Sequence, residues 1–453
     1  MSSHPTILLL GTFDTKWSEC LYLRSQLTKN HYYPITTLLM DVGRTPHPSP
    51  LIDIPHPSLS QEEKIKEEEE EEDDYRHLPR NTYIHTITTA ATPTVSRLYQ
   101  DQKIHAILSL GGSCGTSIAT TIMRDALPIG FPKLMVSTMT SGDVSPYIQE
   151  TDITMMYSVV DVAGMNGILG GVLRNAAGAG AGMASSYFRY LNEMEGEGEG
   201  EGEGESERKD KNKNKNKNKN VKRIGITMFG VTTPGVTAVR EYLEKYYNNG
   251  DDGNETEDGC EIYIFHATGA GGKAMERLIR ENQLDAIVDL TTSEIVDECV
   301  GGVLSAGPGR LSAAAEKGIP QVVSLGACDM VNFGTPDTVP ERFRDRLIYE
   351  HNPMVTIVRT NAEESRAVGR FLAEKLRQAV RPEKVVVVMP VGGLSMLDVK
   401  GQKFWDPEGD EELFGTVESA LKGSGVRVVR HAGDVNGRGF AEGVGRELIQ
   451  LMD

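Results

Sequence analysis

Short apolar runs alternate along the chain with longer stretches in which apolar residues recur at helical spacing. Apolar runs of about four to eight residues that end in Gly, Ser, Thr or Asp predict parallel strands, and the periodic stretches after them predict helices. In the N-terminal half the apolar runs occupy residues 6–10, 35–40, 106–110, 132–138 and 157–162. In the C-terminal half they occupy residues 223–228, 262–265, 285–290, 321–325, 384–389 and 426–429. This alternation predicts an α/β fold of two Rossmann-like lobes, each a mostly parallel, doubly wound sheet.

Two stretches of the chain are too polar to pack into a core. Residues 62–74 are almost entirely charged, and residues 195–220 include an alternation of Glu with Gly and then of Lys with Asn. Such segments remain solvated. We therefore predict a first lobe at 1–190 with a disordered acidic insertion at 46–78, a linker at 191–220 and a second lobe at 221–453. The carboxylates of the insertion are assigned no catalytic role.

Composition narrows the classes of partner. The chain has 453 residues and a net charge of −18, which argues against nucleic acid or an anionic membrane as a partner. Five cysteines are scattered without a CxxC pair, so neither a disulfide framework nor a zinc site is predicted. No apolar run approaches the ~20 residues of a membrane span, and no basic leader opens the chain. We expect a soluble cytoplasmic protein.

A glycine turn after the run at 106–110 is the first candidate site. A strand that enters a helix through such a turn directs backbone N–H groups at one point, and the helix N-terminus favours an anion there. An ordinary tight turn is the alternative, since short glycine motifs are weak signals. The turn contains Gly111, Gly112, Ser113, Gly115 and Thr116.

Two further residues lie at neighbouring turns. Lys16 follows the first strand, and because the two strands are expected to be neighbours in a doubly wound sheet, it could neutralise a phosphate at the glycine turn. Asp41 ends the second strand, where Rossmann-like domains often hold a ribose. A solvated lysine and a turn aspartate explain these positions equally well.

The second half offers weaker candidates for chemistry. Gly269–Lys273 resembles a second anion-binding turn, and Asp289 and Glu294 at the end of the run at 285–290 could reach a cleft. His351 could act as a general base. A structural role is the alternative for each of these residues, and no catalytic assignment is made beyond naming Asp289, Glu294 and His351 as candidates.

Several segments in fixed order resemble one family, that of the ATP-binding N-terminal region of the tomato mosaic virus resistance protein and its uncharacterised bacterial and fungal relatives. The resemblance covers nearly the whole chain apart from the polar insertions. The segments are Gly11–Lys16, Gly111–Ser117, Ala267–Met275, Asp289–Ile295, Ser305–Pro308, Asp329–Gly334 and His351–Pro353.

The resemblance implies two Rossmann-like lobes, ATP bound mainly to the first lobe, and a homodimer. It implies that the turn of Gly111, Gly112, Ser113, Gly115 and Thr116 cradles the phosphates. By the same resemblance Lys16 meets the phosphates, Asp41 contacts the ribose and Arg97 contacts the nucleotide. Mg²⁺ is expected to accompany ATP, held largely by phosphates and water. Cys114 stands where the family pattern leads us to expect glycine.

Three functions follow as hypotheses. The first is an ATP-binding protein with a small-ligand cleft between its lobes, with hydrolysis left open. The second is a nucleotide-responsive module that binds a protein partner without turnover. The third is an enzyme that acts on a small metabolite at the lobe interface. Whether the chain is an enzyme is left undecided at this point.

Overall fold

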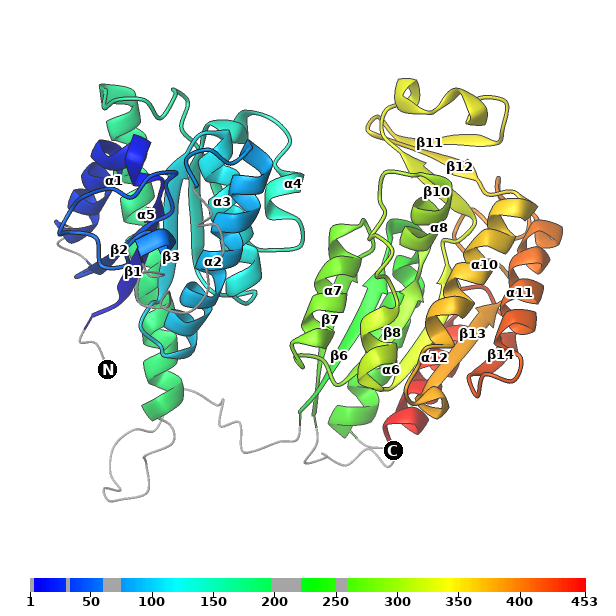
Figure 1. Cartoon of the computed structure of the whole chain (residues 1–453). Helices are drawn as coiled ribbons and strands as arrows, with labels where there is room; N and C mark the ends of the chain where they lie inside the picture. Colours follow the sequence, from blue (N-terminus) through cyan, green and yellow to red (C-terminus); the bar gives the residue numbers. More distant parts are fainter. Residues whose placement is uncertain (1–3, 30–32, 60–74, 197–220, 250–258) are drawn as a thin grey trace, which may run out of the picture. The chain divides into compact units, whose positions relative to one another are not determined.

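The computed structural model describes residues 4–29, 33–59, 75–196, 221–249 and 259–453, which fall into two compact units at 1–208 and 209–453 (Figure 1). The predicted linker begins inside the last helix of the first unit, which ends at residue 196, and its remainder, 197–220, lies outside the described residues. The acidic run at 60–74 also lies outside them.

The flanks of the acidic run are ordered, so the predicted disordered insertion at 46–78 was drawn too wide. His56 is buried, and its Nε2 atom lies 2.7 Å from the carbonyl oxygen of Gly43. Tyr75 is buried as well, with its ring edge-on to the His56 ring. The prediction was too wide because it rested on the high share of polar residues in this stretch. His56 and Tyr75 nevertheless anchor the flanks to the first unit.

The first unit is built on a five-stranded parallel sheet in the order β2-β1-β3-β4-β5. Its strands are β1 (Thr6–Gly11), β2 (Thr36–Asp41), β3 (Ala106–Gly111), β4 (Lys133–Ser137) and β5 (Thr154–Tyr157). Its helices are α1 (Phe13–Thr28), α2 (Arg80–Gln100), α3 (Ser113–Ala126), α4 (Ser145–Ile148) and α5 (Gly167–Gly196).

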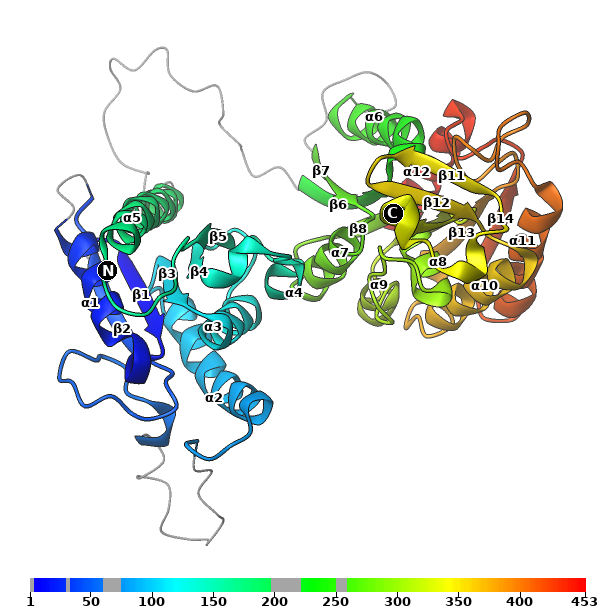
Figure 2. The same cartoon turned by 90° about the horizontal axis from the view of Figure 1, so that it is seen from above.

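Helices cover both faces of this sheet, α1 and α5 on one side and α2 and α3 on the other (Figure 2). Alternate residues of β1 explain the layering, because successive strand residues point to opposite faces. Ile7 and Leu9 pack in the cluster of α1 and α5, whereas Leu8 and Leu10 pack in the cluster of α2 and α3. A strand buried on both faces reads as one continuous apolar run, which is the pattern in the sequence.

The second unit contains a six-stranded parallel sheet in the order β14-β13-β9-β8-β6-β7. Its strands are β6 (Val221–Met228), β7 (Gly259–His266), β8 (Ala286–Thr291), β9 (Gln321–Gly326), β13 (Val385–Pro390) and β14 (Arg427–His431). Its helices are α6 (Thr233–Asn249), α7 (Ala270–Arg280), α8 (Ser293–Val300), α9 (Ser312–Lys317), α10 (Ala362–Leu376), α11 (Pro407–Leu421) and α12 (Arg438–Met452). Helices α6 and α12 pack on one face of the sheet, and α7 to α11 pack on the other.

A small antiparallel sheet that the sequence pattern did not reveal joins this unit, in the order β10-β12-β11. It consists of β10 (Met330–Phe333), β11 (Ile348–Asn352) and β12 (Val355–Arg359). Arg359 ties it to the rest of the unit: its Nε donates to the carbonyl of Phe404 over 2.8 Å, and its Nη2 donates to Asp410 over 2.5 Å. Asp398 lies 3.6 Å from the same guanidinium, and Asp329 lies close by in the same buried cluster.

The predicted fold class is confirmed, because both units carry parallel sheets with helices on both faces. Counted from the first strand of each unit, the two sheets share one order, 2-1-3-4-5, and the second sheet adds a sixth strand. In such sheets the order in which strands are added reverses between the first and third strands. Ligands bind outside the carboxyl ends of these two strands. Among the described helices none is long and apolar enough to cross a membrane.

Candidate functional site

The first unit has a pocket of about 260 Å³ where β1 and β3 end, at the point where its strand order reverses. It is lined by the first turn of α1, the loop after β2, the start of α2 and the start of α3. The lining residues are Thr12, Asp14, Thr15, Lys16, Arg44, Arg80, Tyr83, Gly112, Ser113, Cys114 and Gly115. The structure thus brings Lys16 and the glycine turn together, because β1 and β3 are neighbours.

The glycine turn presents the N-terminus of α3 to the pocket. Thr116 makes the first hydrogen bond inside this helix, from its N–H to the carbonyl of Gly112 over 2.9 Å. The N–H groups of Ser113, Cys114 and Gly115 precede that bond, at the end of the helix where donors lack an intrahelical acceptor. With the partial positive charge of the helix end, these groups make this wall of the pocket suited to an anion.

Thr116 and Gly111 support the turn from behind and do not line the pocket. Thr116 is fully buried, and its hydroxyl lies 2.8 Å from the carbonyl of Gly112 and 2.6 Å from Ser137 Oγ. Gly111 packs closely on the turn, because a Cβ there would lie 3.3 Å from Gly115 Cα. Both residues therefore shape the cradle through packing rather than through contact with a ligand.

Three cationic side chains border the pocket. Lys16 lies at a kink near the start of α1, where its φ of −126° and ψ of 22° depart from helical values. It has no ion-pair partner within the described part of the chain. Arg80 begins α2 and donates from Nη2 to the hydroxyl of Ser113 over 2.6 Å. Arg44 follows β2, and its guanidinium lies over the ring of Tyr83 at 4.5 Å.

Asp14 and Tyr83 hold the loop that carries Arg44. Asp14 accepts the backbone N–H of Arg44 over 2.9 Å, so the carboxylate beside the cations already has a partner. The Tyr83 hydroxyl donates to the carbonyl of Val42 over 2.7 Å. Burial raises the pKa of Tyr83 above its ordinary value, so the phenol remains protonated and keeps this donor role.

Asp41 and Arg97, the other two residues expected at the nucleotide, do not line the pocket. Asp41 is buried, and its carboxylate accepts the backbone N–H groups of Gly43 and His47, each over 2.9 Å, and that of Phe13 over 3.3 Å. It therefore acts as a turn aspartate that fixes the loop after β2. Arg97 is exposed in the last turn of α2, seventeen positions along the helix from Arg80 and about 25 Å away at 1.5 Å per residue.

Arg44 and Arg80 are the pocket residues that the sequence reasoning missed. Both lie just outside the predicted disordered insertion at 46–78, each two residues from its border. Only their positions in the chain could have indicated that they line a pocket. Arg44 comes three residues after the carboxyl end of β2, and Arg80 is the first residue of α2. Loops at the carboxyl ends of parallel strands share one edge of the sheet, so a cation there is a candidate ligand.

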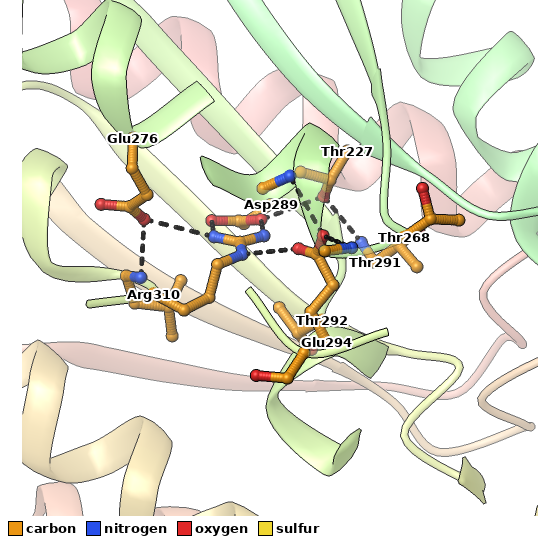
Figure 3. A network of polar contacts seen from close by, with 12 residues as sticks. Thr227, Thr268, Glu276, Asp289, Thr291, Thr292, Glu294 and Arg310 are labelled. Atoms are coloured by element: carbon orange, nitrogen blue, oxygen red, sulfur yellow. Dashed lines mark hydrogen bonds and ion pairs between the residues drawn. The ribbon is translucent and has the colours of Figure 1, made fainter. Parts of the chain in front are cut away.

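The catalytic candidates of the second unit, Asp289 and Glu294, belong to a buried ion-pair network around Arg310 (Figure 3). Arg310 binds Asp289 through both terminal nitrogens, with 2.8 Å between Nη1 and Oδ2, and its Nε donates to Glu294 over 2.8 Å. Glu276 accepts from the same guanidinium over 3.4 Å. Burial by itself would lower the pKa of Arg310, but these carboxylates hold it well above its ordinary value.

Glu294 also fills the anion-binding turn that was expected at Gly269–Lys273. Its Oε1 atom accepts the N–H groups of Gly269 over 2.7 Å and of Gly272 over 3.0 Å. The turn therefore does bind an anion, and the anion is a carboxylate of the same chain. A Cβ on Gly272 would lie 2.1 Å from Glu294 Oε2, so glycine is required for this close approach.

His351 lies apart from these carboxylates. It is exposed near the end of β11, whereas Asp289 and Glu294 are buried at the carboxyl end of β8 and in α8. The second unit therefore does not assemble the three candidates into one acid–base group. Their roles as catalysts stay predictions without geometric support, and the carboxylates have structural partners that account for them.

Two bacterial relatives match this chain along nearly its whole length. A UPF0261 protein of Clostridium tetani is 40% identical over 449 residues and covers 99% of both chains. A relative in Rhizobium meliloti is 37% identical over 438 residues, 96% of each chain. The solved structure of MurG from Acinetobacter baumannii aligns with 98% of this chain and 99% of its own at 10% identity, with a TM-score of 0.21. A score this low leaves the fold assignment to rest on the two sheets themselves.

The tomato relatives confirm the similarity to the tomato mosaic virus resistance protein, and the ATP binding that the resemblance implies stays a prediction. The ToMV resistance protein Tm-1(GCR237) of Solanum lycopersicum is 35% identical over 90% of this chain and 50% of its own length. The ToMV susceptible protein tm-1(GCR26) of the same plant is 33% identical over the same shares. Because resistant and susceptible proteins match almost equally, the similarity carries no statement about resistance.

Two family models cover the chain, and their boundary falls at the division between its two units. Residues 5–189 match the N-terminal domain, and residues 221–452 match the C-terminal domain, of one family. The chain belongs to the Uncharacterised protein family (UPF0261).

Proposed function

We propose that the first unit binds ATP, with the nucleotide phosphates against the start of α3 and between the side chains of Lys16 and Arg80, while Arg44 adds positive charge to the pocket wall. The observation that carries this proposal is the coincidence of three cations and a helix N-terminus in one pocket at the strand-order reversal of the sheet. A polyphosphate needs both features, because several charges must be neutralised and its oxygens need N–H donors.

Magnesium fits this site as a companion of the phosphates. Mg²⁺ prefers oxygen ligands and keeps several waters when it accompanies a nucleotide, and it would offset part of the phosphate charge. Asp14 is the one carboxylate on the pocket wall within the described residues, and it accepts the N–H of Arg44. We therefore assign the ion to phosphate oxygens and water rather than to a protein carboxylate.

The pocket favours binding over hydrolysis. Hydrolysis needs a group that orients or activates the attacking water. The lining residues within the described chain include no histidine, and their carboxylate is already hydrogen-bonded to a backbone N–H. This geometry bears on turnover alone, and the protein partner of the second hypothesis, a nucleotide-responsive module, stays a prediction. The metabolite-enzyme hypothesis loses support, because Arg310 engages its two carboxylates.

Calorimetric titration with Mg-ATP tests the site on wild type, Lys16→Ala and Gly112→Val. We expect Lys16→Ala to weaken binding about tenfold, the typical loss for a hydrogen bond to a charged group. Gly112 has a φ of −84°, and a Cβ there would have Thr138 Oγ1 as its nearest neighbour at 3.8 Å. Valine therefore fits the backbone, and its branches obstruct the phosphate wall.

Arg97→Ala is the matched control, because it removes one positive charge from the same helix that carries Arg80 but far from the pocket. We expect its affinity to equal that of wild type. Equal affinity in wild type, Lys16→Ala and Gly112→Val would exclude the pocket as the ATP site. A loss in Arg97→Ala alone would restore Arg97 as the nucleotide contact.

A further inference from the structure

A continuous chain of contacts connects the four loops around the pocket. It runs from the Asp14 carboxylate to the backbone of Arg44, and from the Arg44 guanidinium to the segment that precedes α2. The same segment leads into Arg80, which contacts Ser113 at the start of α3. Lys16 takes no part in this chain within the described residues, so the three cations of the pocket divide into a coupled pair and a separate lysine.

Arg44 is the central member of this chain. Its Nη1 atom lies 2.8 Å from the carbonyl oxygen of Leu78, 3.2 Å from that of Tyr75 and 3.3 Å from that of Arg76. The guanidinium also rests on the ring of Tyr83. Backbone carbonyls that end a loop need donors, and the N–H groups of this one guanidinium nitrogen are shared among the three carbonyls. Arg44 thus binds the backbone rather than standing free in the pocket.

The segment held by Arg44 sets the position of Arg80. Leu78 is two residues before Arg80, and Pro79 between them has a fixed φ, here −53°. The first hydrogen bond of α2 runs from the N–H of Tyr83 to the carbonyl of Pro79 over 2.9 Å. Fixing residues 75–78 therefore fixes the first turn of α2, and with it the direction in which the exposed Arg80 side chain reaches the turn of α3.

We propose that Arg44, held by Asp14 and Tyr83, is a positioning residue that places Arg80 over the phosphate wall of the pocket. The proposal rests on the proposed function, because its consequence is the binding of a polyphosphate. It assigns Asp14 a structural role in the site, and it makes Arg80, which contacts Ser113 in this structure, the cation that binds the ligand. Lysine keeps the charge but is not equivalent to Arg44, because an ammonium lacks the planar group that rests on the Tyr83 ring while it donates to the carbonyls.

A double-mutant cycle on the full chain tests the proposal, with Mg-ATP affinity as the readout. We expect Arg80→Ala to weaken binding about tenfold and Arg44→Lys, which keeps the charge, to weaken it nearly as much. The double variant should be no weaker than Arg80→Ala alone, because the position of Arg80 no longer matters once its guanidinium is gone. Lys16→Ala combined with either variant should show multiplied losses.

A second measurement does not depend on the ligand. Amide hydrogen exchange without ATP should be faster at Tyr83 in Arg44→Lys than in wild type, because the first turn of α2 has lost its anchor. Arg80→Ala leaves that anchor in place, so its exchange rate at Tyr83 should match that of wild type. Unfolding by urea, followed by circular dichroism, checks that both variants remain folded.

Multiplied losses in the Arg44→Lys/Arg80→Ala pair would make Arg44 an independent ligand and overturn the positioning role. Unchanged exchange at Tyr83 in Arg44→Lys would overturn it as well. A wild-type protein that does not bind Mg-ATP would instead overturn the proposed function, while faster exchange at Tyr83 would still show that Arg44 anchors α2. The two failures are therefore distinguishable.

Discussion

The role of a charged side chain in this protein depends on which groups it contacts. Asp14, Asp41 and Glu294 all accept backbone N–H groups at the carboxyl edge of a sheet, and each holds a loop in place. Lys16, at the same kind of edge, has no such partner among the described residues. A charge with internal partners supports the fold, whereas a charge without them remains available for a ligand.

Arg310→Met should strongly destabilise the second unit. The substitution leaves the buried carboxylates of Asp289 and Glu294 without their cation, and breaking a buried pair from one side costs about 3–5 kcal/mol. Urea unfolding monitored by circular dichroism measures the loss. Arg438→Met is the control, because the Arg438 side chain is 86% exposed and should change stability by less than about 0.5 kcal/mol. Equal stability of the two variants would contradict the structural role of Arg310.

Asp398 makes the stability of the second unit depend on pH. Burial, with the neighbouring Asp329 and Asp410 carboxyls, raises the pKa of Asp398 to about 9 in the folded protein. A raised folded pKa means that the folded state holds a proton that the unfolded state has released. Stability from this group is complete below the unfolded pKa of about 4 and is lost as pH rises toward 9, by at most about 1.4 kcal/mol per pH unit.

Asp398→Asn tests this dependence, because the amide keeps the shape of a protonated carboxyl and does not titrate. We expect the variant to lose the decline in unfolding free energy between pH 6 and pH 9 that wild type shows in urea titrations. Its Oδ1 atom can still accept the N–H of Leu394, which now donates to Asp398 Oδ2 over 3.0 Å. An unchanged decline in Asp398→Asn would assign the titration to another group of the cluster.

Helix α5 shows how one element can combine required and dispensable glycines. A Cβ on Gly180 would lie 2.6 Å from Leu108 Cδ2, so this glycine lets the helix approach β3 closely. A Cβ on Gly178 would meet no atom within 4 Å. Glycine in a helix interior destabilises the helix through its backbone entropy. At Gly180 close packing against Leu108 offsets this cost, whereas at Gly178 no contact does.

The paired variants Gly180→Ala and Gly178→Ala should therefore have opposite effects. Gly180→Ala should destabilise the first unit by about 1–3 kcal/mol through overpacking against Leu108. Gly178→Ala should stabilise it by about 0.5–1 kcal/mol. Thermal unfolding by calorimetry compares the two variants with wild type, and a stabilising Gly180→Ala would show that α5 does not rest on β3 as described.

Elements with strong patterns were predictable, and elements with weak ones were not. Most parallel strands could be located because they contain apolar runs, and the clearest of them, such as β3 and β13, are buried on both faces. The antiparallel sheet escaped prediction because β11 is mostly exposed and β10 is four residues long, too short for a periodic signal. Strand β5 was displaced for the same reason, since its residues are exposed or half-buried.

At the scale of the molecule, the meeting of Lys16 with the glycine turn could be predicted, because the strand order of a doubly wound sheet follows from general topology. The partners of Asp289 and Glu294 could not be predicted. Arg310 comes sixteen residues after Glu294, in a loop without a pattern of its own. Such pairs depend on the path of loops in space, and a single sequence carries no signal for that path.

Binding of ATP should stabilise the first unit. A ligand that binds the folded state at 100 times its dissociation constant adds about 2.7 kcal/mol to the free energy of unfolding. We expect Mg-ATP to slow amide exchange in β1, β3 and the first turn of α3, because opening of these elements destroys the pocket. Magnesium chloride alone is the control. Exchange in these elements that is indifferent to saturating Mg-ATP would contradict the assignment of the pocket.

The carboxylate of Glu294 has a consequence for how the two units respond to their surroundings. It is an anion that belongs to the chain itself and is always present at the turn of Gly269 and Gly272. In the first unit, no carboxylate among the described residues forms an ion pair with Lys16 or occupies the start of α3. An anion at that pocket therefore has to come from solution. Sulfate or phosphate buffers should therefore raise the melting temperature of the first unit more than that of the second, which gains only the general stabilisation of apolar burial by these salts.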